Sequence, residues 1–156
     1  MSNVPLPQGS QHIVPYVYYE DPRAATEYLC RVFGFEQLMM LEWPDGSVAH
    51  AEVAMSGERV LIGGADPRFG LASAQAFDVV HTVLCVYVAD VEAHYEHARS
   101  HDVEIVRDIT DAFYGARIYS GRDCEGHLWE FREQRSEPSE VELTESLAQL
   151  ARMIGR

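Results

Sequence analysis

The chain has 156 residues, 47% hydrophobic and 24% charged, which suits one globular domain with a buried core. No apolar run approaches the roughly 20 residues that span a bilayer, and residues 1–11 lack the basic start and apolar stretch of a secretory signal. The net charge of −13 disfavours nucleic acid and anionic membranes as partners. It favours a cationic ligand, or it serves solubility. Cys30, Cys85 and Cys124 have no paired spacing, which indicates a reducing cytoplasm rather than a disulfide framework.

Two segments of the chain repeat one pattern 69 positions apart. Seven of sixteen positions are identical without a gap, from His12 and His81 to Glu27 and Glu96. Each copy reads as an apolar strand, an acidic turn and an amphipathic helix. The repeat therefore predicts two copies of one structural unit.

The first copy predicts one strand, one helix and three further strands. Residues 12–19 are rich in Val, Ile and Tyr, as strands are. Asp21 suits a helix N-cap, Pro22 the first helical position and Gly34 the helix end. Pro-Asp-Gly and Ser-Gly turns then separate three predicted strands, at 36–43, 47–55 and 59–63.

The second copy follows the same plan. Its first strand is predicted at 81–88, Asp90 caps its helix, and three strands follow at 103–108, 117–121 and 127–133. Beyond this copy, the sequence predicts a helix with an apolar stripe that packs on its own domain or on a dimer partner. The stripe consists of Leu143, Leu147, Leu150 and Ile154.

The predicted organisation is one α+β domain over 1–156. It comprises βαβββ units at about 11–66 and 80–135, a linker at about 64–79 and a C-terminal helix at about 139–155. The ligand pocket is expected where the two units face each other.

The closing segment of the second copy, 113–131, resembles the signature of the vicinal oxygen chelate superfamily. Glyoxalase I, the bleomycin-resistance proteins and the extradiol dioxygenases belong to that superfamily. An aromatic-Gly-x-Arg stretch at Tyr114–Arg117 precedes an Asp-x-x-Gly-His turn at Asp123–His127 and a strand with Trp129. Cys124 stands where the family commonly has Pro.

Two further segments, 13–16 and 32–36, resemble the PhnB-like branch of that superfamily. The resemblance covers about 11–134. It implies a curved open sheet in which two βαβββ units enclose a cleft, and a homodimer. It is specific for the fold and weak for the function, because this fold supports many activities.

Metal-dependent members that resemble glyoxalase I take four ligands from the first and last strands of the two units. The matching first-strand positions here are Val14 and Val83, and residues 60–63 of the last strand in unit one offer no donor either. Only Glu130 matches a ligand position. The resemblance therefore implies a protein without a resident metal.

A second arrangement keeps a divalent metal as the alternative. His12 and His81 lie two residues before those valines and hence on the same strand face, so a register shift of one pair could bring them to a metal. With Glu130 they would form a two-His, one-carboxylate set for iron or zinc. Otherwise both histidines lie near the rim and satisfy local hydrogen bonds.

Several side chains are candidates for binding a ligand in the cleft. Tyr16, Trp43 and Tyr114 could contact a planar or cationic molecule, or pack in the core. Arg117 could hold a carboxylate or phosphate in a two-pronged hydrogen bond. Its alternative role is a structural ion pair with an acid such as Asp123.

Two acid–base candidates complete the predicted site. His50 and Glu52 share one strand face and form either an acid–base pair or a surface ion pair. Glu130 is the candidate catalytic residue, and it would act as a general base that moves a proton next to a carbonyl. Its alternative role is that of a buried carboxylate paired with Arg117 or a histidine. Trp129 is next to Glu130 on the strand, so the two side chains point to opposite faces. If Glu130 points into the cleft, Trp129 belongs to the core.

The sequence thus favours a metal-independent binding protein of the bleomycin-resistance type, holding a small aromatic or cationic molecule. The alternative is a metal-dependent lyase, isomerase or dioxygenase-like enzyme of the same superfamily. Enzymatic activity is left open between the two.

Overall fold

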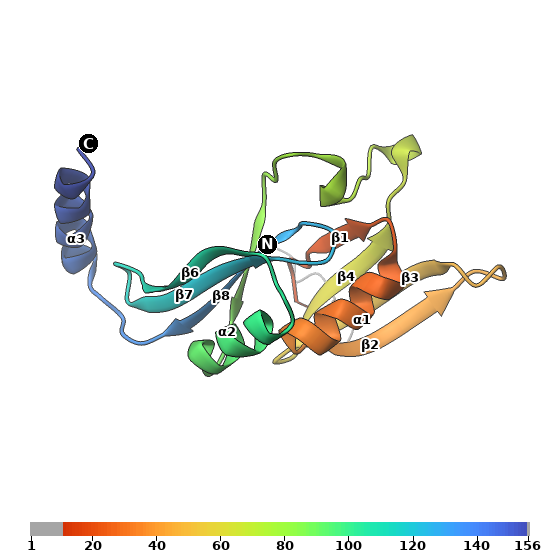
Figure 1. Ribbon diagram of the computed structural model, residues 1–156, viewed down its shortest axis with the longest axis horizontal. Coiled ribbons are helices and arrows are strands. Elements are labelled where there is room, and N and C mark those ends of the chain that lie inside the picture. Colours follow the sequence, from red (N-terminus) through yellow and green to blue (C-terminus); the bar gives the residue numbers. More distant parts are fainter. Residues whose placement is uncertain (1–10, 156) are drawn as a thin grey trace, which may run out of the picture. The chain divides into compact units, whose positions relative to one another are not determined.

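The computed structural model describes residues 11–155, which form two compact units. Unit 1 contains the described residues up to His81 together with the turn Asp123–His127. Unit 2 contains Thr82–Arg122 and the described residues from Leu128 onward. Each unit has one four-stranded sheet with a helix on one face (Figure 1).

Unit 1 begins with a βαβββ module whose sheet, sheet 1, has the strand order β1-β4-β3-β2. Strand β1 runs parallel to β4, and the other neighbours are antiparallel. The elements are β1 (Tyr16–Tyr19), α1 (Pro22–Phe33), β2 (Glu36–Glu42), β3 (Val48–Met55) and β4 (Glu58–Gly64).

Unit 2 repeats this topology in sheet 2, with the order β5-β8-β7-β6 and β5 parallel to β8. The tandem βαβββ prediction is therefore confirmed, as is the C-terminal helix. The elements are β5 (Val83–Tyr87), α2 (Val91–Ser100), β6 (Ile105–Asp111), β7 (Ala116–Arg122), β8 (Leu128–Gln134) and α3 (Glu140–Met153).

The first strand of each module is shorter than the sequence predicts. Pairing of β1 with β4 starts at Tyr16, because Pro15 has no N–H to donate to the ladder. The Gln11 side chain instead bonds the backbone of Arg59, at 2.8 Å to its carbonyl and 3.1 Å from its N–H. Strand β5 starts at Val83, opposite the first residue of β8.

The predicted helix caps are present. The Asp21 side chain accepts hydrogen bonds from two backbone N–H groups in the first turn of α1, where Pro22 is the first residue. Gly34 ends α1 with a φ of 75°, the left-handed region that glycine enters without strain. Asp90 caps α2 by accepting from the N–H of Ala93 at 2.8 Å.

Each sheet buries the face that its helix covers. In sheet 1 the fully buried residues Tyr19, Val53 and Ile62 pack against α1. In sheet 2 the residues Trp129 and Phe131 are fully buried under α2, which confirms that Trp129 belongs to the core. The opposite face of each sheet is called here its helix-free face.

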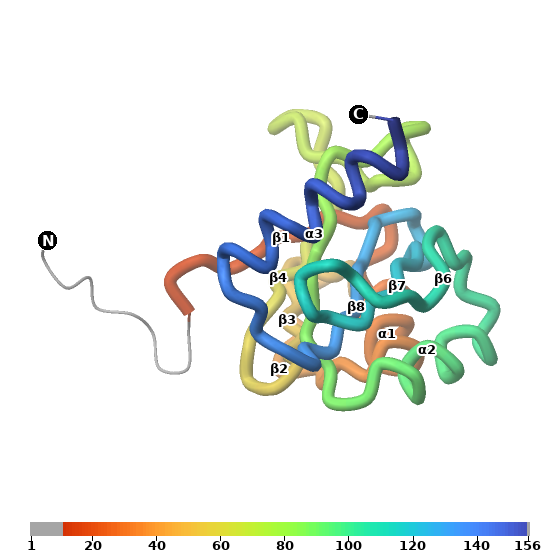
Figure 2. The backbone as a smooth tube through the Cα atoms, turned by 90° about the vertical axis from the view of Figure 1, so that its left-hand side faces the viewer, coloured from red at the N-terminus to blue at the C-terminus, as the bar shows by residue number. Residues whose placement is uncertain are grey.

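Two segments lie outside the modules. The chain leaves the end of β4 through two short 3-10 turns, Pro67–Phe69 and Ala74–Ala76, before it enters β5 (Figures 1 and 2). Helix α3 follows β8 after a short irregular stretch, and none of its residues is buried. Among residues 11–155, no helix is both long and apolar enough to cross a membrane.

Candidate functional site

The helix-free face of sheet 1 carries a stacked pair of tyrosines. Tyr16 and Tyr18 alternate along β1, so their rings lie on one face, with centroids 4.8 Å apart and planes 13° apart. The ring of Tyr16 lies over Gly63 of β4, where an added Cβ would come within 2.9 Å of it. Tyr16 stays 43% exposed, so this stacked pair presents aromatic surface to solvent.

A chain of polar contacts continues from this pair across the same face. The Tyr16 hydroxyl lies 3.0 Å from His50 Nδ1, and His50 Nε2 lies 3.2 Å from Glu52 Oε1. Arg59 Nη1 donates to the other oxygen of Glu52 at 2.9 Å. Both ring nitrogens of His50 are thus engaged, one with the Tyr16 hydroxyl and the other with the Glu52 carboxylate. The predicted pairing of His50 with Glu52 is present.

The helix-free face of sheet 2 is built around Glu130. This side chain is 8% exposed and alternates with the core residue Trp129. Arg107 Nη1 donates to Glu130 Oε2 at 3.2 Å, and Arg132 Nη2 donates to Oε1. The Cys85 thiol lies 3.9 Å from the same Oε1 and accepts a 3.2 Å contact from Arg132 Nη2.

Arg132 lies between two aromatic rings. Its guanidinium carbon is 5.6 Å from the ring centroid of Tyr87 and 5.5 Å from that of Tyr114. Burial raises the pKa of the Tyr114 hydroxyl, and the nearby Glu130 carboxylate adds to that rise. Burial likewise raises the pKa of the Cys85 thiol, which stays protonated and therefore unreactive near neutral pH.

Four of the predicted site residues lie outside the strands, and one of them, Tyr114, is in the turn between β6 and β7. His12 and His81 are exposed and occupy bends before β1 and β5, so the strand alternation that would align them does not apply. Trp43 follows β2 at the turn into β3 and is 60% exposed. Tyr16, His50, Tyr114 and Glu130 do lie on or beside the helix-free faces.

The expected orientation of Arg117 toward the ligand is wrong. Arg117 alternates with the buried Ile118 and points to the face that α2 covers. Its Nε lies 2.6 Å from Glu92 in the first turn of α2, and its Nη1 donates to Asp111 at 2.9 Å. These two acids, rather than Asp123, make it a structural ion-pairing residue.

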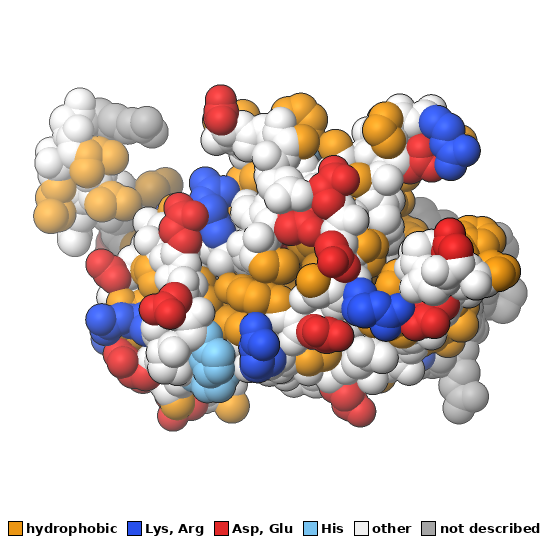
Figure 3. All heavy atoms as spheres, turned by 45° about the vertical axis from the view of Figure 1, so that its right-hand side comes forward, with side chains coloured by type: hydrophobic (Ala, Val, Ile, Leu, Met, Phe, Trp, Pro, Cys, Tyr) orange, Lys and Arg blue, Asp and Glu red, His pale blue; other side chains and the backbone are white. Residues whose placement is uncertain are grey.

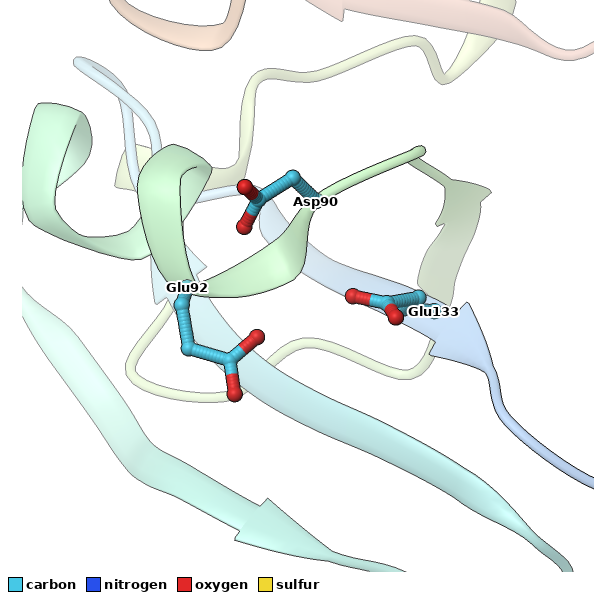
Figure 4. Close-up of side chains that lie close together, drawn as sticks. All are labelled: Asp90, Glu92 and Glu133. Carbon is cyan, nitrogen blue, oxygen red and sulfur yellow. The ribbon is translucent and has the colours of Figure 1, made fainter.

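The chain does not fit a metal site of the glyoxalase I type. Both carboxylate oxygens of Glu130 already accept from arginines, and Val14 and Val83 have no donor atom. Within residues 11–155 the grouped metal-ligating side chains are Asp90, Glu92 and Glu133 (Figure 4).

That acidic group is explained by its protein partners. Asp90 and Glu92 come from the start of α2 and Glu133 from β8 (Figure 4). Glu133 accepts from the N–H of Val91 at 3.1 Å, and Arg135 contacts both Glu92 and Glu133. The carboxylates therefore act as helix caps and ion-pair partners.

The Asp123–His127 turn, which carries the family resemblance, belongs to unit 1 and buries the side chains of Asp123 and Glu125 there. The Tyr19 hydroxyl donates to Asp123 at 2.6 Å, and Glu125 accepts from the backbone N–H groups of Glu20 and Asp21 at 2.7 and 2.9 Å. His127 Nε2 lies 2.9 Å from the carbonyl of Tyr18. This turn therefore serves structure and offers no open ligand position.

Sequence reasoning missed the arginines of the helix-free faces, Arg59, Arg107 and Arg132. The available signal was strand alternation, since Arg132 lies two residues after Glu130 and shares its face. The positions of Arg59 and Arg107 depend on pairing between strands distant in sequence, which alternation along one strand does not give.

Comparison with known proteins gives the chain a family. The model of the Glyoxalase/Bleomycin resistance protein/Dioxygenase superfamily matches residues 9–131. An uncharacterised protein of Mycobacterium tuberculosis (strain ATCC 25618 / H37Rv) is 25% identical over 118 residues, which are 74% of this chain and 69% of that protein.

Solved structures agree with this assignment. TioX from Micromonospora sp. ML1 is 32% identical, with a TM-score of 0.65, over 80% of this chain and 99% of TioX. Protein PA1353 from Pseudomonas aeruginosa shares the fold at 16% identity and a TM-score of 0.62, over 81% of this chain and 100% of its own. The chain is therefore a member of the glyoxalase/bleomycin resistance protein/dioxygenase superfamily.

Proposed function

We propose that the protein binds a small aromatic molecule on the helix-free face of sheet 1, without a metal ion. The observation that carries this proposal is the stacked pair of Tyr16, which is 43% exposed, and Tyr18, which is partly buried. Planar rings bind favourably against such a surface, by offset or edge contacts. Met39 and Leu41 add exposed apolar area from β2, at positions paired with Glu52 and His50.

Metal independence is supported by the state of the candidate ligands. The Glu130 oxygens are occupied by two guanidinium groups, and the two predicted histidines lie in exposed bends. Membership in a superfamily whose description names bleomycin resistance proteins beside glyoxalases and dioxygenases is compatible with a binding protein.

The proposal includes a homodimer in the cytoplasm, with a second copy of the chain covering α3. Leu147 and Ile154 on the apolar stripe are 52% and 59% exposed. The stripe positions have the 4-3-4 spacing of a helix-pairing seam. The first half of α3 is acidic and its last turn carries Arg152, so an antiparallel copy brings opposite charges together.

Calorimetric titration with naphthol, a neutral planar probe, tests the aromatic site. Tyr18→Leu should weaken binding about fivefold, the equivalent of ~1 kcal/mol for one lost ring contact. Trp43→Leu, which removes a 60% exposed aromatic residue that lies outside the sheet, should leave binding unchanged. Equal losses in the two variants, or no binding at all, would overturn the proposed site.

Elemental analysis of untagged protein tests metal independence. The protein is first dialysed against trace nickel, zinc, iron and manganese. Sub-stoichiometric metal is expected. Near-stoichiometric metal would instead favour the metal-dependent lyase, isomerase or dioxygenase-like alternative.

A further inference from the structure

We infer that the helix-free face of sheet 2 binds the anionic group of a small molecule, a carboxylate or a group of similar charge, through Arg107 and Arg132. This inference rests on the proposed small-molecule function, but its site lies wholly within unit 2 and uses other residues.

The local charge differs in sign from the charge of the whole chain. Around Glu130 there are two guanidinium groups and one carboxylate, a surplus of one positive charge. The chain carries −13 in total, and acidic side chains are spread over the face shown in Figure 3. An anion is therefore attracted to this spot despite the net negative charge, because the nearest charges dominate in partly buried surroundings.

The side chain of Arg132 is fixed in position by its neighbours in the protein. The rings of Tyr87 and Tyr114 and the contacts with Glu130 and Cys85 fix its guanidinium, so little side-chain entropy is lost on binding.

Arg107 supplies the accessible half of the site. Its side chain is 55% exposed, and its contact with Glu130 is a single 3.2 Å hydrogen bond through Nη1. The guanidinium has five N–H donors, so it can still bind a carboxylate with two parallel hydrogen bonds.

The backbone around Arg107 is irregular. The pairing of β6 with β7 shifts register on both sides of this residue, between Ile105 and Arg107 and between Arg107 and Thr110. Such bulges re-aim a side chain and are frequent beside ligand sites. Arg107 pairs with Ser120, which is opposite Glu130, so the irregular strand presents Arg107 at the carboxylate.

A purely structural ion pair with Glu130 would need only one arginine. One guanidinium neutralises Glu130, and Arg132 already does so from the next position on the same face of β8. The second, exposed arginine provides the surplus charge. Tyr87, which is 59% exposed and lies beside Arg132, offers aromatic surface for the ring of an aromatic acid.

The test compares three planar probes of different charge by calorimetric titration of the full chain. Naphthoate should bind about tenfold more tightly than naphthol, as expected for a charge-assisted hydrogen bond, and N-methylquinolinium should show no such gain. Arg107→Met should abolish the advantage of naphthoate over naphthol and its salt dependence. Arg99→Met is the matched control, because the Arg99 side chain is 56% exposed in the same unit.

Glu130→Gln gives an independent second variant. It removes the negative charge and raises the surplus from one to two, so naphthoate should bind more tightly, by about threefold or more. A general base or a metal ligand at this position predicts no such gain. Thermal unfolding of each variant checks that the fold is retained.

The outcomes separate the two proposals. Equal affinity for naphthoate and naphthol, or equal losses in Arg107→Met and Arg99→Met, would overturn the anion site. Naphthol binding that depends on Tyr18 would still support the proposed function in that case. Naphthoate binding that depends on Arg107, without naphthol binding, would support the anion site and refute the aromatic site of sheet 1.

Discussion

Buried polar side chains at the Asp123–His127 turn show how single residues stabilise unit 1. Asp123 and Glu125 are 7% and 8% exposed, and each accepts several hydrogen bonds. Buried carboxylates are tolerated only when they are satisfied in this way. The turn residues that resemble the family signature therefore matter for stability.

Tyr19→Phe tests the contribution of these hydrogen bonds to stability. The substitution removes the hydroxyl that donates to Asp123 and leaves a buried carboxylate oxygen with one donor fewer, at a cost of about 2 kcal/mol of unfolding free energy. Urea unfolding measures the change. Tyr18→Phe is the control, because the Tyr18 ring stacks on Tyr16 through its face and the substitution keeps that ring. Loss of the Tyr18 hydroxyl should cost under about 0.5 kcal/mol of unfolding free energy. Similar costs for both variants would contradict the assigned role.

The same hydroxyl makes stability depend on alkaline pH. Burial, then the adjacent Asp123, raises the pKa of Tyr19 well above its ordinary value. Because the folded pKa exceeds the unfolded one, the contribution is complete below about pH 10 and is lost as the pH rises beyond it. Unfolding free energies should therefore fall as the pH rises above about 10, and less steeply in Tyr19→Phe. Parallel profiles in the two proteins would refute this.

At the scale of elements, each strand and helix begins where backbone hydrogen bonding allows it. Pro15 delays the start of β1, and the ladder of β5 begins only opposite the first residue of β8. Asp21, Asp90 and Ser139 satisfy N–H groups at the starts of the three α-helices. Capping side chains thus determine where these helices start.

Asp90→Ala should shorten or destabilise α2. The lost cap leaves the N–H of Ala93 without its side-chain acceptor, which costs about 1 kcal/mol. Asp90→Asn keeps an acceptor oxygen and removes a negative charge beside Glu92 and Glu133, so it should be neutral or slightly stabilising. Urea unfolding of both variants distinguishes the cap from the acidic group, since a destabilised Asn variant would show that the charge matters.

At the scale of the whole molecule, α3 is the α-helix that packs least against the rest of the described chain. A single 14-residue helix with no buried residues is marginal in water, which supports the proposal of a covering partner. The proposed partner is a second copy of the chain, aligned antiparallel.

Leu147→Glu should dissociate such a dimer. The change places a charge in the middle of the apolar seam, and light scattering after size exclusion should report the monomer mass. Ala148→Glu introduces the same charge at an exposed neighbouring position outside the stripe and should leave the dimer intact. A monomer for the unmodified chain would refute the pairing. Dissociation by both variants would point to charge rather than to the seam.

The sequence by itself determined the repeat, the order of elements and the family resemblance. These depend on local signals: hydrophobic period, Asp21 and Asp90 as caps, and the Asp123–His127 turn. Only the tertiary structure decided which side chains meet. Arg117 is drawn to α2 by Glu92, whereas Arg107 and Arg132 reach Glu130, because strand register and the irregular course of β6 follow from pairing between segments far apart in the chain.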